Sequence, residues 1–268
     1  MLSSVKPGDG PKHIVITGAS SGIGAALARV YGASGRKLSL IGRDCRRLEA
    51  VASDARARGG DVDIYVSDVT DPDAIERVLT TCDLLQPVDL LIASAGIGGR
   101  ASLAPDGGEP SNVARQILTT NTLGVINTVT PLLPRFIARK RGQIAIMSSL
   151  AGLVNLPACP AYCASKAATL AYGAALRGLM APSGVAVAVI CPGFVDTPMS
   201  ASLPFRPPFL WTADRAARHV ARALARGQRE ILFPWPLAVA VRMLSILPTA
   251  LTDRVLMLLR ERMSPWQI

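Results

Sequence analysis

Residues 13–24, with the sequence HIVITGASSGIG, form a short apolar run followed by a turn rich in glycine. The apolar run predicts a buried strand, and the residues after the turn have the spacing of a helix. Gly18, Gly22 and Gly24 let the backbone turn tightly and approach a pyrophosphate, which then rests on the free amides of the helix N-terminus. A strand, a glycine-rich turn and a helix in this order predict a dinucleotide-binding unit.

Short apolar runs alternate with longer Ala/Leu-rich segments along most of the chain. Nearly continuous apolar runs are typical of parallel strands buried on both faces, and right-handed crossovers put helices on both faces of such a sheet. The sequence therefore predicts a single doubly wound (Rossmann-type) α/β domain with seven parallel strands. The predicted strands are His13–Ile16, Lys37–Ile41, Asp61–Val66, Leu90–Ala93, Gln143–Met147, Val185–Ile190 and Glu230–Phe233. The predicted helices are Ile23–Ser34, Arg46–Arg58, Pro72–Leu84, Val113–Ala138, Ala161–Met180 and Asp214–Arg226.

The length of 268 residues suits one large domain, and no linker interrupts it. We expect residues 1–233 to form the dinucleotide-binding catalytic part and residues 234–268 an apolar C-terminal extension of the same domain, ending in a helix near Thr252–Met263. Arg242 and Pro248 divide this extension into pieces shorter than the roughly 20 residues that span a bilayer. Three interpretations follow: a lid over an apolar substrate pocket, a subunit contact, or a helix lying on a membrane surface.

The net charge of +10 raises the question of an anionic partner. Nucleic acid is not expected, because the arginines are spread along the chain and aromatic residues make up only 4% of it, too few for base stacking. Arginines also recur every three or four residues between 215 and 229, which predicts a solvated helix face. The alternative is that this stripe and the C-terminal extension together dock an anionic membrane surface or a long apolar substrate with an acidic head.

The five cysteines are scattered without a Cys-x2-Cys pair, and the chain has only two histidines. Neither a metal site nor a disulfide framework is expected. Cys159 and Cys163 flank Tyr162, and buried packing is favoured for them over a reactive role. Residues 1–12 lack the apolar stretch of a secretory signal, so the expected location is the reducing cytoplasm.

Tyr162 and Lys166 lie four residues apart in a helical pattern, and Ser149 comes thirteen residues before the tyrosine, after the predicted strand Gln143–Met147. Positions i and i+4 share one face of a helix, so the ammonium comes near the phenol. A free tyrosine has a pKa of about 10, and a nearby cation lowers that pKa. A serine hydroxyl beside the phenol can hold a substrate oxygen, and the spacing favours Ser149 over Ser148. The pattern predicts a proton-transfer site.

The end of the predicted strand Lys37–Ile41 bears on the choice of dinucleotide. Folds of this kind often carry an acid there that bonds the ribose 2′-hydroxyl, whereas this chain has Gly42, Arg43 and Asp44. The Arg43 guanidinium suits a 2′-phosphate, which an acid would repel. NADP(H) is therefore favoured. NAD(H) stays the alternative, because Asp44 is close enough to reach a ribose hydroxyl and Ser21 stands where the loop would carry a second basic residue.

These motifs, in their order and spacing, resemble the short-chain dehydrogenase/reductase family from about residue 12 to residue 233. The resemblance implies a catalytic set of Asn121, Ser149, Tyr162 and Lys166. Tyr162 would donate a proton to a substrate carbonyl oxygen that Ser149 holds. Lys166 would lower the phenol pKa and hold the nicotinamide ribose, and Asn121 would position a water that connects Lys166 to solvent.

The resemblance also extends to the cofactor. Asp68 and Val69 fall where the family contacts the adenine ring, and residues 192–197 fall where it packs on the nicotinamide, with Thr197 bonding the carboxamide. The family usually has Asn-Asn-Ala-Gly after the fourth strand, and here Ser94 replaces the second asparagine, which weakens a brace of the sheet. The expected cofactor-binding residues are Gly18, Ser20, Ser21, Gly22, Ile23, Gly24, Arg43, Asp68, Val69, Ala95, Gly96, Tyr162, Lys166, Pro192, Gly193, Val195 and Thr197.

The expected function is an NADP(H)-dependent oxidoreductase that interconverts a carbonyl and a secondary alcohol. Aromatic and proline residues between 198 and 211 indicate an apolar small-molecule substrate. We expect a homodimer or homotetramer with no nucleic-acid partner. The alternative is a catalytically silent, dinucleotide-sensing regulatory protein of the same fold, against which the intact set of four polar residues argues.

Overall fold

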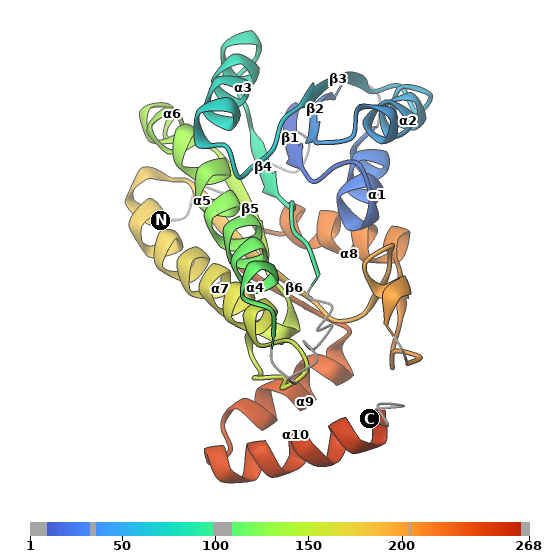
Figure 1. Ribbon diagram of the computed structural model, residues 1–268. Helices are drawn as coiled ribbons and strands as arrows, with labels where there is room; N and C mark the ends of the chain where they lie inside the picture. The colour runs from blue at the N-terminus through green and yellow to red at the C-terminus, as the bar shows by residue number, and fades with distance from the viewer. Residues whose placement is uncertain (1–9, 33–35, 99–108, 204, 264–268) are drawn as a thin grey trace.

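The computed structural model describes residues 10–32, 36–98, 109–203 and 205–263, which build a parallel sheet with helices on both faces (Figure 1). The strand order is β3-β2-β1-β4-β5-β6-β9, and all neighbouring pairs are parallel. The predicted seven-stranded, doubly wound α/β fold is therefore confirmed. The strands are β1 (His13–Thr17), β2 (Lys37–Gly42), β3 (Asp61–Val66), β4 (Leu90–Ala93), β5 (Gln143–Met147), β6 (Ala186–Pro192) and β9 (Glu230–Phe233), and a separate pair joins β7 (Val195–Asp196) to β8 (Trp211–Thr212).

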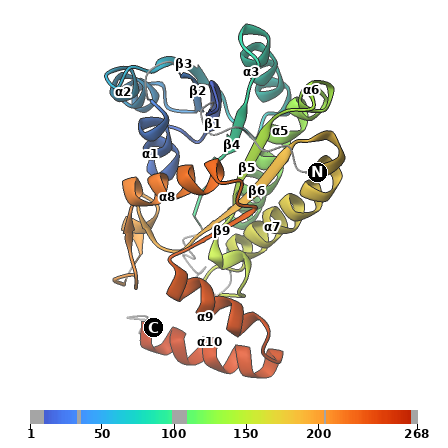
Figure 2. The same ribbon diagram turned by 180° about the vertical axis from the view of Figure 1, so that it is seen from behind.

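Helices α1, α2 and α8 cover one face of the sheet, and α3 to α7 cover the other (Figures 1 and 2). Each predicted helix other than Val113–Ala138 is present with ends shifted by a few residues, although Ser34 lies outside the described residues. The helices are α1 (Gly22–Tyr31), α2 (Cys45–Arg56), α3 (Pro72–Leu85), α4 (Ser111–Leu118), α5 (Gly124–Val129), α6 (Leu133–Arg139), α7 (Pro160–Met180), α8 (Ala213–Ala225), α9 (Trp235–Ser245) and α10 (Thr249–Met263).

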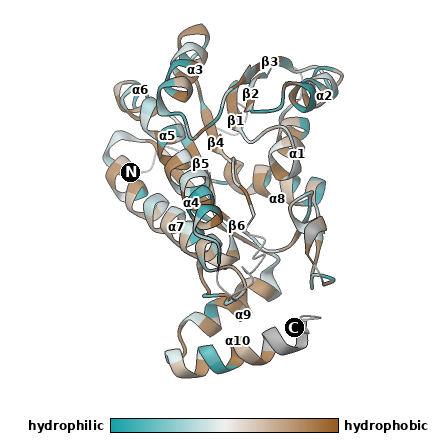
Figure 3. Ribbon diagram, viewed as in Figure 1, coloured by the Kyte–Doolittle hydropathy of each residue, from teal (hydrophilic) through white to brown (hydrophobic). Residues whose placement is uncertain are grey.

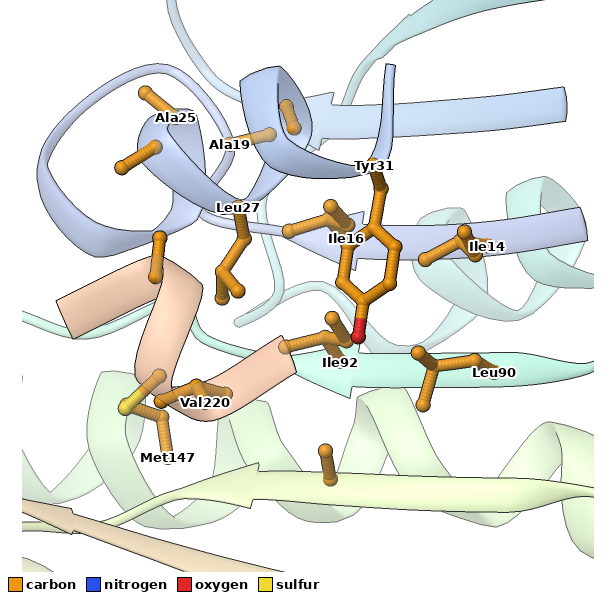
Figure 4. Packing of buried hydrophobic residues seen from close by; sticks show 14 of the residues in the cluster. Ile14, Ile16, Ala19, Ala25, Leu27, Tyr31, Leu90, Ile92, Met147 and Val220 are labelled. Carbon is orange, nitrogen blue, oxygen red and sulfur yellow. The ribbon is translucent and has the colours of Figure 1, made fainter. Parts of the chain in front are cut away.

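The two faces of the sheet have separate hydrophobic cores because successive strand residues point to opposite sides. Ile14 and Ile16 of β1 pack toward α1 and α8, where Leu27 and Val220 meet them (Figure 4). Val15 packs toward the opposite layer. All three strand residues are fully buried, and each such side chain contributes about 1.5–3 kcal/mol through removal from water.

The segment Val113–Ala138 was predicted as one helix, and this prediction is wrong in detail. A π-helical turn, Thr119–Leu123, separates α4 from α5, and a 3-10 turn, Thr130–Leu132, separates α5 from α6. The prolines at 131 and 134 lack the backbone N–H that a regular helix uses. The π turn has a different cause, since the Asn121 side chain within it is bonded to the chain after β4.

Helices α9 and α10 follow β9 directly and lie together at one end of the molecule (Figure 1). Val241 of α9 and Leu256 of α10 form a small buried hydrophobic cluster with Val154. Apolar side chains in this region remain exposed, including Trp235 and Ile246, and Figure 3 shows brown hydrophobic stretches along both helices. Within the described residues, no helix combines the length and the apolar character needed to cross a membrane.

Candidate active site

The residues predicted from sequence gather at the carboxyl edge of the sheet. Parallel strands all end at this edge, so the segments that follow β1, β2, β4, β5 and β6 meet there. These segments supply the glycine turn, Arg43, Gly96, Ser149 and the stretch 192–197. Helix α7 packs against β5 and β6 (Figure 1) and carries Tyr162 and Lys166, whose Nζ reaches the Met147 carbonyl oxygen at the same edge.

The glycine turn is built for close backbone contact. Gly18 has a φ of 68°, and a Cβ atom there would lie 2.7 Å from the Cα of Ala95. At Gly24 a Cβ atom would lie 2.3 Å from the carbonyl oxygen of Gly18. Side chains at either position are excluded, because one would occupy a left-handed backbone conformation and both would collide with main chain.

The N-terminus of α1 keeps its amides available. Among the described residues, the Ser21 side chain caps no amide of this helix, whereas Asp44 and Asp71 cap α2 and α3 by accepting from Arg47 N and Ala74 N, both at 3.0 Å. Uncapped first-turn N–H groups together with the helix dipole favour an anion. The turn and the helix thus fit a dinucleotide pyrophosphate by the chemistry of their donors.

The segment after β6 closes over this helix start. A Cβ atom on Gly22, whose φ is 55°, would lie 3.2 Å from the Cγ2 of Thr197. Gly193 N donates to the Phe233 carbonyl oxygen over 2.7 Å, and a Cβ atom on Gly193 would lie 2.8 Å from Leu237 of α9. The predicted nicotinamide segment is therefore held between α1 on one side and the C-terminal extension on the other.

Ser149 and Tyr162 form the hydroxyl pair of the site. Burial raises the pKa of Tyr162 to about 12, and the hydrogen bond with Ser149 lowers it by a smaller amount. The expected lowering of the tyrosine pKa is therefore wrong for this structure, because desolvation outweighs it. Ser149 also donates to the Pro192 carbonyl oxygen over 3.3 Å and accepts from Ala151 N over 3.1 Å, whereas Ser148 is buried and donates to the Lys166 carbonyl oxygen over 2.7 Å.

Lys166 lies one turn beyond Tyr162 and is almost fully buried. Its Nζ donates to the Met147 carbonyl oxygen over 3.1 Å and lies 5.7 Å from the centre of the Tyr162 ring. Burial lowers the pKa of Lys166 to about 8. The ammonium and the phenol thus share one face of α7, as the spacing predicts.

Asn121 connects the π turn to two neighbouring segments. Its Oδ1 accepts from Ile97 N over 2.8 Å, and its Nδ2 donates to the Ile97 carbonyl oxygen over 3.0 Å and to the Ser165 hydroxyl over 3.1 Å. Both amide hydrogens are thus used within the protein. A Cβ atom on Gly96 would lie 3.2 Å from Asn121 Oδ1 and 3.5 Å from Lys166 Nζ, so the glycine keeps the space beside these groups open.

Arg43 projects from the end of β2 with 60% of its side chain exposed, and its Nη1 lies 3.5 Å from Asp68 Oδ2. Burial alone would raise the pKa of Asp68. Hydrogen bonds from Thr70 and the charge of Arg43 together lower this pKa by more, so the net shift is downward. Asp44 is occupied at the N-terminus of α2 and in an ion pair with Arg47. Both carboxylate oxygens of Asp44 thus already have partners on α2.

Three supporting hydroxyl or small groups were not assigned a role from sequence. The buried Thr17 hydroxyl accepts from Ser94 N at 3.2 Å and Ala95 N at 3.4 Å, which braces the chain beside Ser94. Gly124 gives room to Val69, because a Cβ atom there would lie 2.6 Å from the Val69 Cγ2. Ser165 is the third. A threonine at the end of a strand and a glycine inside a helix are common, so the sequence carried no distinctive signal for them.

The sheet order and the polar groups at its carboxyl edge define a Rossmann-type α/β domain with a dinucleotide-type turn. A model of the short chain dehydrogenase family matches residues 12–206. The chain belongs to the short-chain dehydrogenase/reductase family of NAD(P)(H)-using oxidoreductases.

Relatives agree with this membership. An uncharacterised oxidoreductase of Myxococcus xanthus is 37% identical over 240 residues, which cover 89% of this chain and 94% of that protein. Dehydrogenase/reductase SDR family member 7B of Rattus norvegicus is 36% identical over 196 residues, covering 70% of this chain but only 59% of the longer relative. The solved structure of a short-chain dehydrogenase from Sphingobium yanoikuyae in complex with NADPH has a TM-score of 0.74 at 25% identity, covering 96% of this chain and 98% of that one.

Proposed function

We propose that the protein is an NADP(H)-dependent carbonyl reductase or alcohol dehydrogenase acting on an apolar substrate. The observation that carries the proposal is the convergence of Ser149, Tyr162 and Lys166 beside the glycine turn, at the edge where this fold binds its ligands. A dinucleotide-sensing protein would need the turn but not this hydroxyl and ammonium group.

NADPH, when bound, supplies a hydride to the substrate carbonyl carbon. The residues of this chain supply the rest. The Ser149 hydroxyl donates a hydrogen bond to the carbonyl oxygen and orients it toward Tyr162, and the Tyr162 hydroxyl gives its proton to that oxygen as negative charge develops. Because the pKa of Tyr162 is raised to about 12, the phenol stays protonated at neutral pH, which is the form that reduction requires. Lys166 places a positive charge beside the phenol.

Asn121 is a positioning residue in this proposal. Its side chain fixes Ile97 and Ser165, and through them the chain after β4 and the helix that carries Tyr162. Asn121 Oδ1 has a second lone pair that no described residue uses. With this lone pair Asn121 would hold a water beside Lys166.

The preference for NADP(H) rests on Arg43. Its guanidinium is exposed, and Asp44, the nearest competing acid, is committed to α2. The complex of the Sphingobium relative with NADPH is consistent with this preference. We propose that Arg43 contacts the 2′-phosphate, while Ser20, whose hydroxyl would lie 3.4 Å from a Cβ atom on Gly42, lines the same end of β2.

The apolar substrate is supported by the C-terminal extension. Leu237 of α9 lies against Gly193, in the segment proposed to hold the nicotinamide. Met199, which follows the same segment, lies against Gly98. The Leu237 contact favours the lid interpretation for the start of α9. The exposed apolar side chains of α9 and α10 are consistent with a subunit contact or a peripheral membrane contact. Co-sedimentation with anionic vesicles tests the membrane contact.

A screen of NADPH oxidation against aliphatic, aromatic and cyclic ketones tests the function. Tyr162→Phe should lose about a hundredfold or more of the turnover while keeping its affinity for NADPH, because the proton donor is lost and the ring is retained. Tyr172→Phe, on the same helix, is the matched control and should keep its turnover. If no carbonyl is reduced by a protein that binds NADPH tightly, the dinucleotide-sensing alternative stands. Unchanged turnover in Tyr162→Phe would remove the assigned proton donor.

A further inference from the structure

Two thiols lie beside the proposed proton donor. Cys159 is the N-cap residue directly before α7 and Cys163 lies on the first turn of the helix, so the pair brackets Tyr162. Their sulfur atoms are 3.8 Å apart, and one thiol donates a hydrogen bond to the other. All five cysteines are free thiols in the described structure, and within it these two form the thiol–thiol contact.

We propose that Cys159 and Cys163 form a thiol–disulfide exchange site that reacts with low-molecular-weight disulfides such as oxidised glutathione. Neither the family assignment nor the proposed reductase reaction uses these two side chains. The inference takes up the reactive role that the sequence analysis ranked below buried packing for these cysteines.

The two side chains already point toward each other. Cys159 is the N-cap of α7, with a φ of −154° and a ψ of 64°, and its sulfur lies 3.8 Å from that of Cys163. The sulfurs need to approach by about 2 Å to reach bonding distance. The start of α7 has an independent anchor, because Glu109 Oε2 accepts a hydrogen bond from Ala161 N over 3.0 Å.

Exposure and acidity divide the roles of the two thiols. Cys159 is partly exposed and Cys163 is buried, so a small disulfide in solution meets Cys159 first. The hydrogen bond with Cys159 lowers the pKa of the Cys163 thiol, although burial opposes it, whereas the same bond and burial raise the pKa of the Cys159 thiol, so the first attack is the slower of the two exchanges. Cys163 is thus suited to the second, internal attack, for which the thiolate is the reactive form.

The reaction balances as two exchanges. Cys159 loses its proton to solvent and attacks one sulfur of R–S–S–R, forming a mixed disulfide and releasing RS⁻. The Cys163 thiolate then attacks the Cys159 sulfur and displaces a second RS⁻, and the two released thiolates take up the two protons. The protein dithiol is oxidised to a disulfide, and the small disulfide is reduced to two thiols.

Mass spectrometry of the full-length protein tests the site. After equilibration with oxidised glutathione, we expect a loss of two hydrogen atoms and a peptide cross-linked through Cys159 and Cys163, both reversed by dithiothreitol. Cys163→Ser should stop at a glutathione adduct on Cys159. Cys45 is exposed at the start of α2 and serves as an internal control, because an adduct there proves that the oxidant acted. The Cys45→Ser variant should still form the internal bond.

Two outcomes would overturn the proposal: Cys159 and Cys163 both remaining alkylatable by iodoacetamide while Cys45 carries glutathione, or both carrying glutathione with no internal bond. Because this readout needs no carbonyl turnover, it stands apart from the proposed reductase function. A second readout rests on that function. Turnover should be about tenfold lower in the oxidised protein than in the reduced protein, because the internal disulfide displaces Tyr162. The Cys163→Ser variant cannot form this bond and should not show the fall. A disulfide that forms without changing turnover would overturn this link to catalysis.

Discussion

The Asn121 amide donates to the Ser165 hydroxyl over 3.1 Å, and the same hydroxyl donates to the Tyr162 carbonyl oxygen over 2.7 Å. Ser165→Ala removes both bonds and should lower the free energy of unfolding by about 1–3 kcal/mol, measured by urea denaturation. Turnover should fall about tenfold with little change in NADPH affinity, because Tyr162 loses part of its support. Thr169→Val is the control, since its hydroxyl bonds only its own helix. Wild-type turnover in Ser165→Ala would contradict this positioning role.

The pH profile of reduction should report Lys166. Burial lowers the pKa of its ammonium to about 8, so the positive charge is present below that pH and is lost above it. The kcat/KM for NADPH-dependent reduction should therefore fall as pH rises through about 8, since this parameter reports the free enzyme. Lys166→Arg keeps its charge throughout this range and should be slower but lack the fall. A fall with the same midpoint in both proteins would assign it to another group.

Arg43→Ala should separate the two dinucleotides. Loss of a charge-assisted bond to the 2′-phosphate costs about 1.5–3 kcal/mol, or roughly 10- to 100-fold in the Kd for NADPH. The Kd for NADH should be unchanged, because NADH has no 2′-phosphate. Fluorescence titration measures both values. Arg47→Ala, which removes an exposed arginine paired with Asp44, is the control and should leave NADPH affinity near its original value. An equal loss for both dinucleotides would contradict the proposed contact.

Stability should depend on pH through His13. Its Nδ1 lies 2.7 Å from the Gln86 carbonyl oxygen and its Nε2 lies 2.9 Å from the Ser39 hydroxyl, and burial lowers its pKa below the ordinary 6.5. The unfolded chain then binds the proton more readily, so the free energy of unfolding should decline as pH falls from about 7 to 5.

Urea unfolding at several pH values measures this effect. The decline should flatten in His13→Gln, which has no ring to titrate. In the control His219→Gln, the contribution of His13 remains, so a decline should persist. Identical slopes in the original protein and in His13→Gln would show that other groups govern stability in this range.

The strands could be predicted because parallel strands buried on both faces are nearly continuous apolar runs, as in His13–Thr17 and Ala186–Pro192. Tyr162 and Lys166 were found because a helix repeats nearly every four residues. The interruption at Asn121 could not be predicted, since it depends on hydrogen bonds to Ile97, far along the chain. The tyrosine pKa was misjudged because spacing reveals a nearby charge but not the loss of solvent. The division at residues 233 and 234 stays a prediction.

The π turn at Thr119–Leu123 contains one residue more than regular α-helical winding would use, as the bond from Gly124 N to the Thr119 carbonyl oxygen indicates. Each residue turns a helix by about 100°, so the extra one sets the angular offset between α4 and α5. A shorter chain, with one residue deleted here, would wind more evenly and yet point Asn121 away from Ile97. The extra residue therefore sets the relative orientation of α4 and α5, and this less regular winding lets the two helices pack against different neighbours.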